Sequence, residues 1–382
     1  MSRTNVLATA ANAAAVGHML RHRLSGSRVS MPDIASLSAS LNEASRRFHI
    51  SSALVACNAR GSALPQLRSS AEGAAEHYSS LSALLRRMGE AELPTIVTIN
   101  GHVTGAAAGV AAHAAACVVT ERACMSLPGP AFGFVPESFA SYQLARLPRG
   151  LGAYLALTGA TLSAREMVEL GLATHATESK SLRRVNDILN EQSTRHLGRT
   201  LRNVEEVCIE PRFYPYSDTD ALFHIDSIEE CFGQPTLPEI LRALEAGTTP
   251  WHEQALGVLR ASSPLAIHLT FNSIQRAAAA ECWTTVLKME ADLTVKAMGS
   301  ADFAAGAEAL EYHKLQLDRE VMPSVDLDAT AEDDAEAKAK VAMDTHVLHL
   351  SELEADKYGD VGAWEHDAIE AVPSGTIGSY FP

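Results

Sequence analysis

The sequence has 382 residues, of which 47% are hydrophobic and 20% are charged, ordinary values for a globular protein. These values exclude a mostly disordered chain, a collagen-like chain and a small disulfide-rich scaffold. The net charge is −15, from 31 basic and 46 acidic side chains, which disfavours broad binding of a nucleic-acid backbone. Contact with RNA through a local basic patch remains open.

The charge is spread unevenly along the chain. Residues 1–32 carry four arginines and no acid, whereas residues 324–382 carry 14 acids and three lysines. An Ala-rich, acid-free start with arginines is typical of a mitochondrial transit peptide, so we expect a mitochondrial (matrix) location. The alternative is a terminal segment that is basic by chance.

Membrane and metal chemistry are not expected. The longest apolar run, residues 104–119, is interrupted by His113 and is too short for a transmembrane helix. The six cysteines form no Cys-x-x-Cys pair, which argues against a zinc ribbon and favours reduced thiols.

The predicted elements alternate between strands and helices as far as about residue 177. Apolar or β-branched runs predict strands at 16–24, 51–57, 94–100, 117–120 and 125–127. Helices are predicted from Pro32 onward, at 71–89, and from Gly105 to about Ala115. From Pro136 helical patterns dominate, so the pattern predicts an α/β fold with a helical C-terminal half.

Two segments carry a family resemblance. The strand at 94–100 leads into a Gly-rich helix start at 101–109, and a Leu-Ala-Leu-Thr-Gly run follows at 155–159, with Ala164, Ala173 and Thr174-His175 beyond it. This arrangement resembles the crotonase (enoyl-CoA hydratase/isomerase) superfamily, which implies a ββα spiral core.

The C-terminal half narrows the resemblance to the 3-hydroxyisobutyryl-CoA hydrolases. The order and spacing are similar in the runs Cys231-Phe232, Glu239-Ile240, Ser263-Pro264, Met289-Glu290 and Asp302-Phe303. We therefore expect a basic extension at 1–15, a crotonase-like core at 16–180, a helical hydrolase-like part at 181–323, and an acidic extension with an apolar tail at 324–382.

The resemblance implies a site in which two backbone N–H groups stabilise charge on a thioester oxygen. One donor position matches Ala106, whose N–H could still serve. The other lies in a loop where the family has paired glycines and an Asp, but this chain reads Gly-Ser-Ala-Leu-Pro-Gln-Leu at 61–67, and Pro65 has no N–H. The alanines at 106–108 have two interpretations. Their methyl groups narrow the site, or alanine is present only because it favours the helix.

The acidic pair implied by the resemblance is also altered. Where the hydrolases carry a catalytic Glu, this chain has Gly129, which offers no base or nucleophile. The second acid, an Asp in the family, matches Glu137. Glu308 stands where the family has an Arg. His102 and His113 lie near the site, either as bases or as structural residues.

We therefore predict that Gly129 and Glu137 are vestiges of a catalytic pair and that Ala106 is a remnant of an oxyanion hole. No functional catalytic residue, cofactor or metal is expected, nor is binding of a CoA thioester. Inactive relatives of these hydrolases are components of mitochondrial ribosomal small subunits, so the resemblance implies a structural subunit with protein partners and limited rRNA contact. Three alternatives stay open: a respiratory-complex subunit, a divergent hydrolase that uses Glu137, and a CoA-thioester sensor without turnover.

Overall fold

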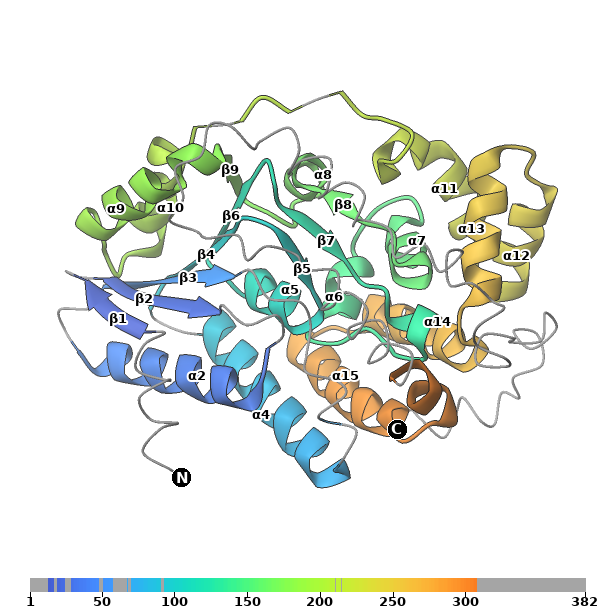
Figure 1. The fold of residues 1–382 in the computed structure, drawn as a ribbon, viewed down its shortest axis with the longest axis horizontal. Coiled ribbons are helices and arrows are strands. Elements are labelled where there is room, and N and C mark those ends of the chain that lie inside the picture. Colours follow the sequence, from blue (N-terminus) through green and yellow to red (C-terminus); the bar gives the residue numbers. More distant parts are fainter. Residues whose placement is uncertain are drawn as a thin grey trace, which may run out of the picture.

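A computed structural model describes residues 13–16, 19–24, 29–47, 51–57, 67, 70–90, 93–209, 211–213 and 215–307. The acidic extension at 324–382 lies outside these residues. The elements lie around one main sheet, with helices on both of its faces (Figure 1).

The main sheet has six strands in the order β1-β2-β3-β4-β6-β9. Its strands are parallel except for β1, which pairs antiparallel with β2. The bounds are β1 Ala13–Val16, β2 Met19–Leu24, β3 Ser52–Cys57, β4 Thr95–Ile99, β6 Ala116–Thr120 and β9 His175–Thr177. A smaller sheet has the order β5-β7-β8, with bounds β5 His102–Thr104, β7 Cys124–Ser126 and β8 Leu162–Ser163.

Successive side chains of the central strands point to opposite faces of the main sheet, as the pleat requires. One face joins a large apolar cluster that includes Val55 and Val97 of the sheet and Leu81 of a covering helix. The other face contributes Leu54 and Ile96 to a smaller, separate cluster. Both faces are covered, and this explains why the central strands β3, β4 and β6 are mainly apolar.

The helices of the N-terminal half are α2 Met31–Arg46, α4 Ala71–Glu90, α5 Gly105–Ala112, α6 Ala140–Leu144, α7 Leu151–Thr158 and α8 Ala164–Glu169. Helix α2 begins at a capping box in which the Ser30 N–H donates to Asp33 Oδ2 at 2.9 Å. The predicted helices from Pro32 and at 71–89 are confirmed. Helix α5 ends at Ala112, earlier than predicted, because the chain turns at His113 to enter β6.

The C-terminal half is helical, as predicted. Its helices are α9 Leu182–Glu191, α10 Leu197–Val207, α11 Ile225–Phe232, α12 Leu237–Ala246, α13 Pro250–Ala261, α14 Pro264–Ala279 and α15 Trp283–Met298. Short 3₁₀ helices lie at η1 Gly129–Phe132, η2 Ser179–Ser181 and η3 Ala221–His224, and residues 301–307 are helical. Buried residues of α12, α14 and α15 belong to the same large cluster as the sheet.

The predicted strands at 51–57, 94–100, 117–120 and 125–127 are confirmed to within one residue, and β2 lies within the predicted strand at 16–24. The sequence did not predict β1, β5, β8 and β9 as separate strands. All six cysteines are free. Within the described ranges, no helix has both the length and the apolar character needed to cross a membrane.

Candidate functional site

The start of helix α5 is the centre of the candidate site. The N–H groups in the first turn of a helix have no intrahelical acceptor and must find one elsewhere. The Ala106 N–H donates to Glu137 Oε1 at 3.1 Å. Ala106 is 0% exposed and Glu137 is 4% exposed, so this bond is shielded from water. The structure thus brings together the predicted oxyanion-hole remnant and the predicted second acid.

A second buried carboxylate lies beside Glu137. Glu290 of α15 is 1% exposed, and its carboxylate accepts the N–H groups of Phe139 and Ser141, the latter at 2.6 Å. The pKa of Glu290 is raised to about 7, mainly by burial; the hydrogen bonds from Ser141 and Phe139 oppose this shift, and the charge of Glu137 adds to it. Glu137 thus ties the start of the turn to α5, and Glu290 holds the backbone within and after the turn.

That turn is strained. Ser138 and Phe139 have φ angles of 64° and 81°, a region that costs a residue other than glycine about 1–3 kcal/mol. Helix α5 packs against the turn at Gly109, where an added Cβ would lie 2.5 Å from both Cβ and O of Ser138. Glycine is required at position 109 because no side chain fits between the helix and the turn.

Position 129 is tight for any side chain. Gly129 is buried at the start of η1, and an added Cβ would lie 3.1 Å from the carbonyl oxygen of Phe134. Gly159 ends α7 with a φ of 68°, and a Cβ there would lie 2.7 Å from Cα of Pro128. The last glycine of the Leu-Ala-Leu-Thr-Gly run, which is part of the resemblance, therefore packs directly against Pro128, the residue before Gly129.

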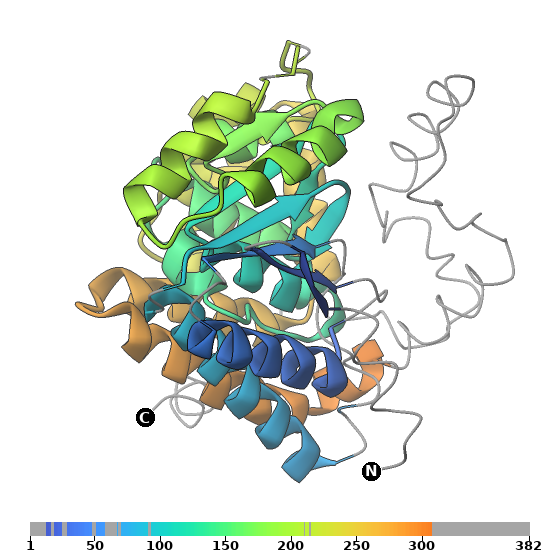
Figure 2. The same ribbon diagram turned by 90° about the vertical axis from the view of Figure 1, so that its left-hand side faces the viewer.

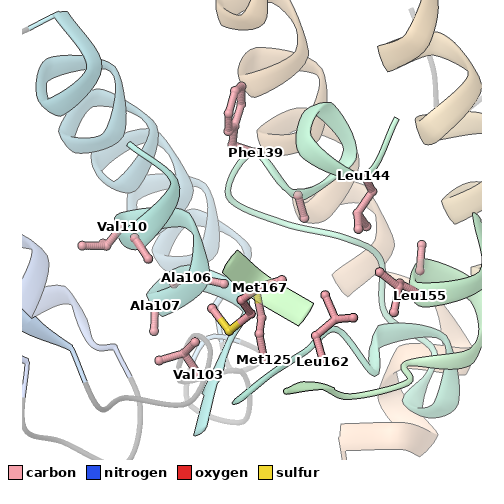
Figure 3. Close-up of a cluster of buried hydrophobic side chains, with 14 of the residues drawn as sticks. Val103, Ala106, Ala107, Val110, Met125, Phe139, Leu144, Leu155, Leu162 and Met167 are labelled. Carbon is pink, nitrogen blue, oxygen red and sulfur yellow. The ribbon is translucent and has the colours of Figure 1, made fainter. Parts of the chain in front are cut away.

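The space next to α5 is filled with apolar side chains. Figure 3 shows Met125 and Met167 between Ala106 of α5 and Leu162 of β8. The gap between these side chains has a cavity volume of about 0 Å³, which is too small for a water molecule. Its lining is mainly apolar: Met125, Ser126, Leu127, Leu144, Leu155, Ala160 and Leu162.

Two predicted site segments fall partly outside the described residues. Of the loop at 61–67 only Leu67 is described, and it packs against the large apolar cluster. Of the segment that begins at Ala304, only residues up to Ala307 are described. The rings of Phe303 and Phe134 are tilted by 42° with centroids 5.2 Å apart, and a Cβ at Gly306 would lie 1.9 Å from the Phe132 oxygen. The retained motif at 302–306 therefore docks the last described helix on η1.

The two candidate histidines have different surroundings. His113 Nδ1 lies 2.8 Å from the Gly109 oxygen, so this nitrogen carries the proton, and the ring contacts Phe139 and Trp283. Burial lowers the pKa of His113, which keeps the ring neutral. His102 Nε2 lies 2.8 Å from the Ser126 hydroxyl. The environment of His113 is that of a structural residue at a helix end.

Glu290 was not predicted as a site residue from the sequence, although the Met289-Glu290 pair is part of the family resemblance. The available signal was an acid in the apolar stripe of a helix, since Val286, Leu287 and Leu293 of α15 are buried with it. A buried acid requires partners. The partners of Glu290 are N–H groups of the strained turn, and the sequence did not predict this turn.

Comparison with known proteins agrees with this architecture. The profile of the family Enoyl-CoA hydratase/isomerase matches residues 59–323. The chain is 33% identical over 215 residues to 3-hydroxyisobutyryl-CoA hydrolase-like protein 1, mitochondrial, of Arabidopsis thaliana, covering 54% of this chain and 52% of that one. It is 31% identical over 187 residues to small ribosomal subunit protein mS47 of Arabidopsis thaliana, covering 48% of this chain and 45% of that one. The chain spans about half the length of these relatives.

Among solved structures, an enoyl-CoA hydratase from Rhodobacter sphaeroides 2.4.1 superimposes with a TM-score of 0.74. The match covers 97% of this chain and 96% of the other at 20% sequence identity, which supports the fold alone. The fold, the Gly-rich start of α5 and the profile match agree, and the chain belongs to the enoyl-CoA hydratase/isomerase family.

Proposed function

We propose that this protein is a catalytically inactive relative of the 3-hydroxyisobutyryl-CoA hydrolases that serves as a structural subunit of the mitochondrial ribosomal small subunit. The proposal that the protein is inactive rests on one observation, the hydrogen bond from the Ala106 N–H to Glu137 Oε1. An oxyanion-hole donor must lie 2.7–3.1 Å from the oxygen on which charge develops. Here a carboxylate oxygen already occupies that position.

The occupied donor opposes thioester chemistry in two ways. A substrate oxygen can reach the Ala106 N–H only if the buried carboxylate of Glu137 gives up this hydrogen bond, which is costly for a charged group shielded from water. A displaced carboxylate nearby would also repel the developing oxyanion. Gly129 adds no second acid, and the space beside it is bounded by the backbone of Phe134.

The structural role is supported by similarity to mS47 of Arabidopsis thaliana, whose name places that protein in a small ribosomal subunit. The packing also supports it. The motif residues at 155–159 and 302–306 that carry the resemblance maintain tight backbone contacts, while the position of the catalytic acid is lost. A scaffold retained without its chemistry is the pattern expected of a subunit that works through its surface.

A second candidate function, a divergent thioester hydrolase, is favoured by the buried carboxylate that remains at Glu137. A turnover assay separates the two. Purified full-length protein is incubated with 3-hydroxyisobutyryl-CoA and a panel of acyl-CoA thioesters, and free thiol is measured beside a protein-free control. We expect no release above the control. Hydrolysis that disappears in Glu137→Gln would contradict the proposal.

A further inference from the structure

Strand β2 lies inside the main sheet, although it belongs to the acid-free start of the chain that is typical of a transit peptide. Its residues Met19–Leu24 pair parallel with Ser52–Cys57 of β3, and β1 pairs with its other edge. Helix α2 lies next to these blue strands in both views (Figure 2). Because an inner strand is bonded on both sides, its removal would leave backbone groups of β3 without partners.

The side chains of β2 contribute to both apolar clusters. Met19 is buried in the smaller cluster, whereas Leu20 and Leu24 are buried in the large one. Val29, shortly before helix α2, is buried in the large cluster as well. A chain cut after Leu24 would therefore lose apolar side chains from both faces of the sheet, in an interior where close packing leaves few voids.

One arginine of the same strand is bonded to a distant part of the fold. The Arg21 guanidinium donates to the carbonyl oxygen of Asn186 and to Asp187 Oδ1, both at 3.0 Å. Both acceptors belong to helix α9, whose Val185 and Leu189 lie in the same smaller cluster as the sheet. Arg21 thus connects β2 to a helix about 165 residues further along the chain.

The positive charge of the acid-free start lies mostly at β2 and after it. The arginines are at positions 3, 21, 23 and 28, and only the first of them precedes β1. Transit peptides are Arg-rich and poor in acids, and they are normally separate from the mature fold. Removal of the whole acid-free run would here delete β1, β2 and Ser30, the cap of α2. The basic signal and the fold therefore overlap in sequence.

We propose that Arg21 and Arg23 belong to a mitochondrial import signal that is not removed and that becomes strand β2 of the mature protein. In the unfolded precursor this segment offers cations and apolar side chains to a receptor for basic, acid-free sequences. After import the same residues pair with β3, and Arg21 binds Asp187. The signal is therefore readable only before the chain folds, and any proteolytic cut lies before Met19. The inference rests on the mitochondrial location in the proposed function.

The first test determines where the mature protein begins. The full-length precursor with a C-terminal tag is expressed in cells and recovered from their mitochondria. Its first residue is then identified by N-terminal labelling and mass spectrometry. We expect a first residue before Met19, so that Arg21 and Arg23 are found in the mature protein. A first residue at or beyond Met19 would overturn the inference.

The second test asks whether the arginines of β2 direct import. The variant R21Q/R23Q is compared with wild type and with a matched control, R46Q/R47Q, which loses the same charge at the C-terminal end of α2. Each radiolabelled precursor is unfolded in urea before it is added to isolated mitochondria, so that differences in folded stability do not affect the result. We expect R21Q/R23Q to lose most of its protease-protected import and the control to import like wild type. Equal import of all three proteins, or equal loss in both variants, would overturn the inference.

Sedimentation of the tagged protein on a gradient separates this inference from the proposed function. A mature protein that retains β2 but sediments as a free protein would contradict the ribosomal role and support the inference. A mature protein that migrates with the small ribosomal subunit but begins at or beyond Met19 would leave the ribosomal role intact and overturn the inference.

Discussion

The carboxylate of Glu137 accepts the backbone N–H of Ala106 at 3.1 Å, in a position shielded from water. Family resemblance marks these two residues as the remains of an acid and an oxyanion donor. In this protein they bond to each other, so the Ala106 N–H already has an acceptor within the fold.

The bond should contribute to stability. Glu137→Ala leaves the buried Ala106 N–H without an acceptor, which costs about 1–3 kcal/mol. Glu137→Gln retains an amide oxygen that can accept the same N–H and is expected to lose less. Urea unfolding followed by circular dichroism measures both. Equal stability of wild type and Glu137→Ala would show that the bond contributes nothing.

The close contact between α5 and the strained turn gives a prediction with an internal control. Gly109→Ala places a methyl group 2.5 Å from Ser138, and we expect a loss of at least about 2 kcal/mol. Gly257→Ala, in α13, meets nothing within 4 Å and should gain about 0.5–1 kcal/mol from helix propensity. Both substitutions are glycine to alanine within a helix, so a loss at both positions would contradict the packing argument.

Glu290 should make stability depend on pH. Its folded-state pKa of about 7 lies above the ordinary value of 4.5, so between about pH 5 and pH 7 the folded protein keeps a proton that the unfolded chain has lost. Its contribution to the free energy of unfolding therefore decreases as pH rises through this window, by up to about 1.4 kcal/mol per pH unit, and levels off above about pH 8.

The check on Glu290 is chemical denaturation at a series of pH values for wild type and for Glu290→Gln, which cannot titrate at this position. The free energy difference between the two proteins should change through the window and be constant above it. A difference that stays the same from about pH 5 to pH 8 would show that Glu290 does not hold a proton in the fold.

Restoring the lost acid should not restore chemistry. The double substitution Gly129→Glu and Glu137→Asp restores the two acidic residue types that the hydrolases carry at these positions. A side chain at 129 meets the backbone of Phe134, and the loop at 61–67 still lacks paired glycines. We expect no thioester hydrolysis and a loss of about 1–3 kcal/mol from crowding at position 129. Hydrolysis by the double variant, measured as thiol release, would show that only the acids had been missing.

The sequence predicted the central strands because both faces of the sheet are covered, which makes 51–57 and 94–100 continuous apolar runs. It did not predict β1, β5, β8 and β9 as separate strands, since strands of two to four residues are too short to show a period in the sequence. Strands β8 and β9, for example, form through pairing with Cys124–Met125 and with 118–120.

At the site, motif positions identified Ala106 and Glu137 but not the bond between them. Glu137 is followed by two consecutive left-handed residues, Ser138 and Phe139, a conformation that no local propensity favours. The turn is held in place by Glu290, more than a hundred residues further along the sequence. A long-range contact of this kind has no signal in the local sequence.

The most direct measurement is native sedimentation of a mitochondrial lysate in which this protein is followed by antibody or mass spectrometry. We expect it to migrate with the ribosomal small subunit and to remain there in moderate salt. A peak at the size of a free monomer or small oligomer would contradict the structural role, and a peak in a different large particle would contradict the ribosomal assignment.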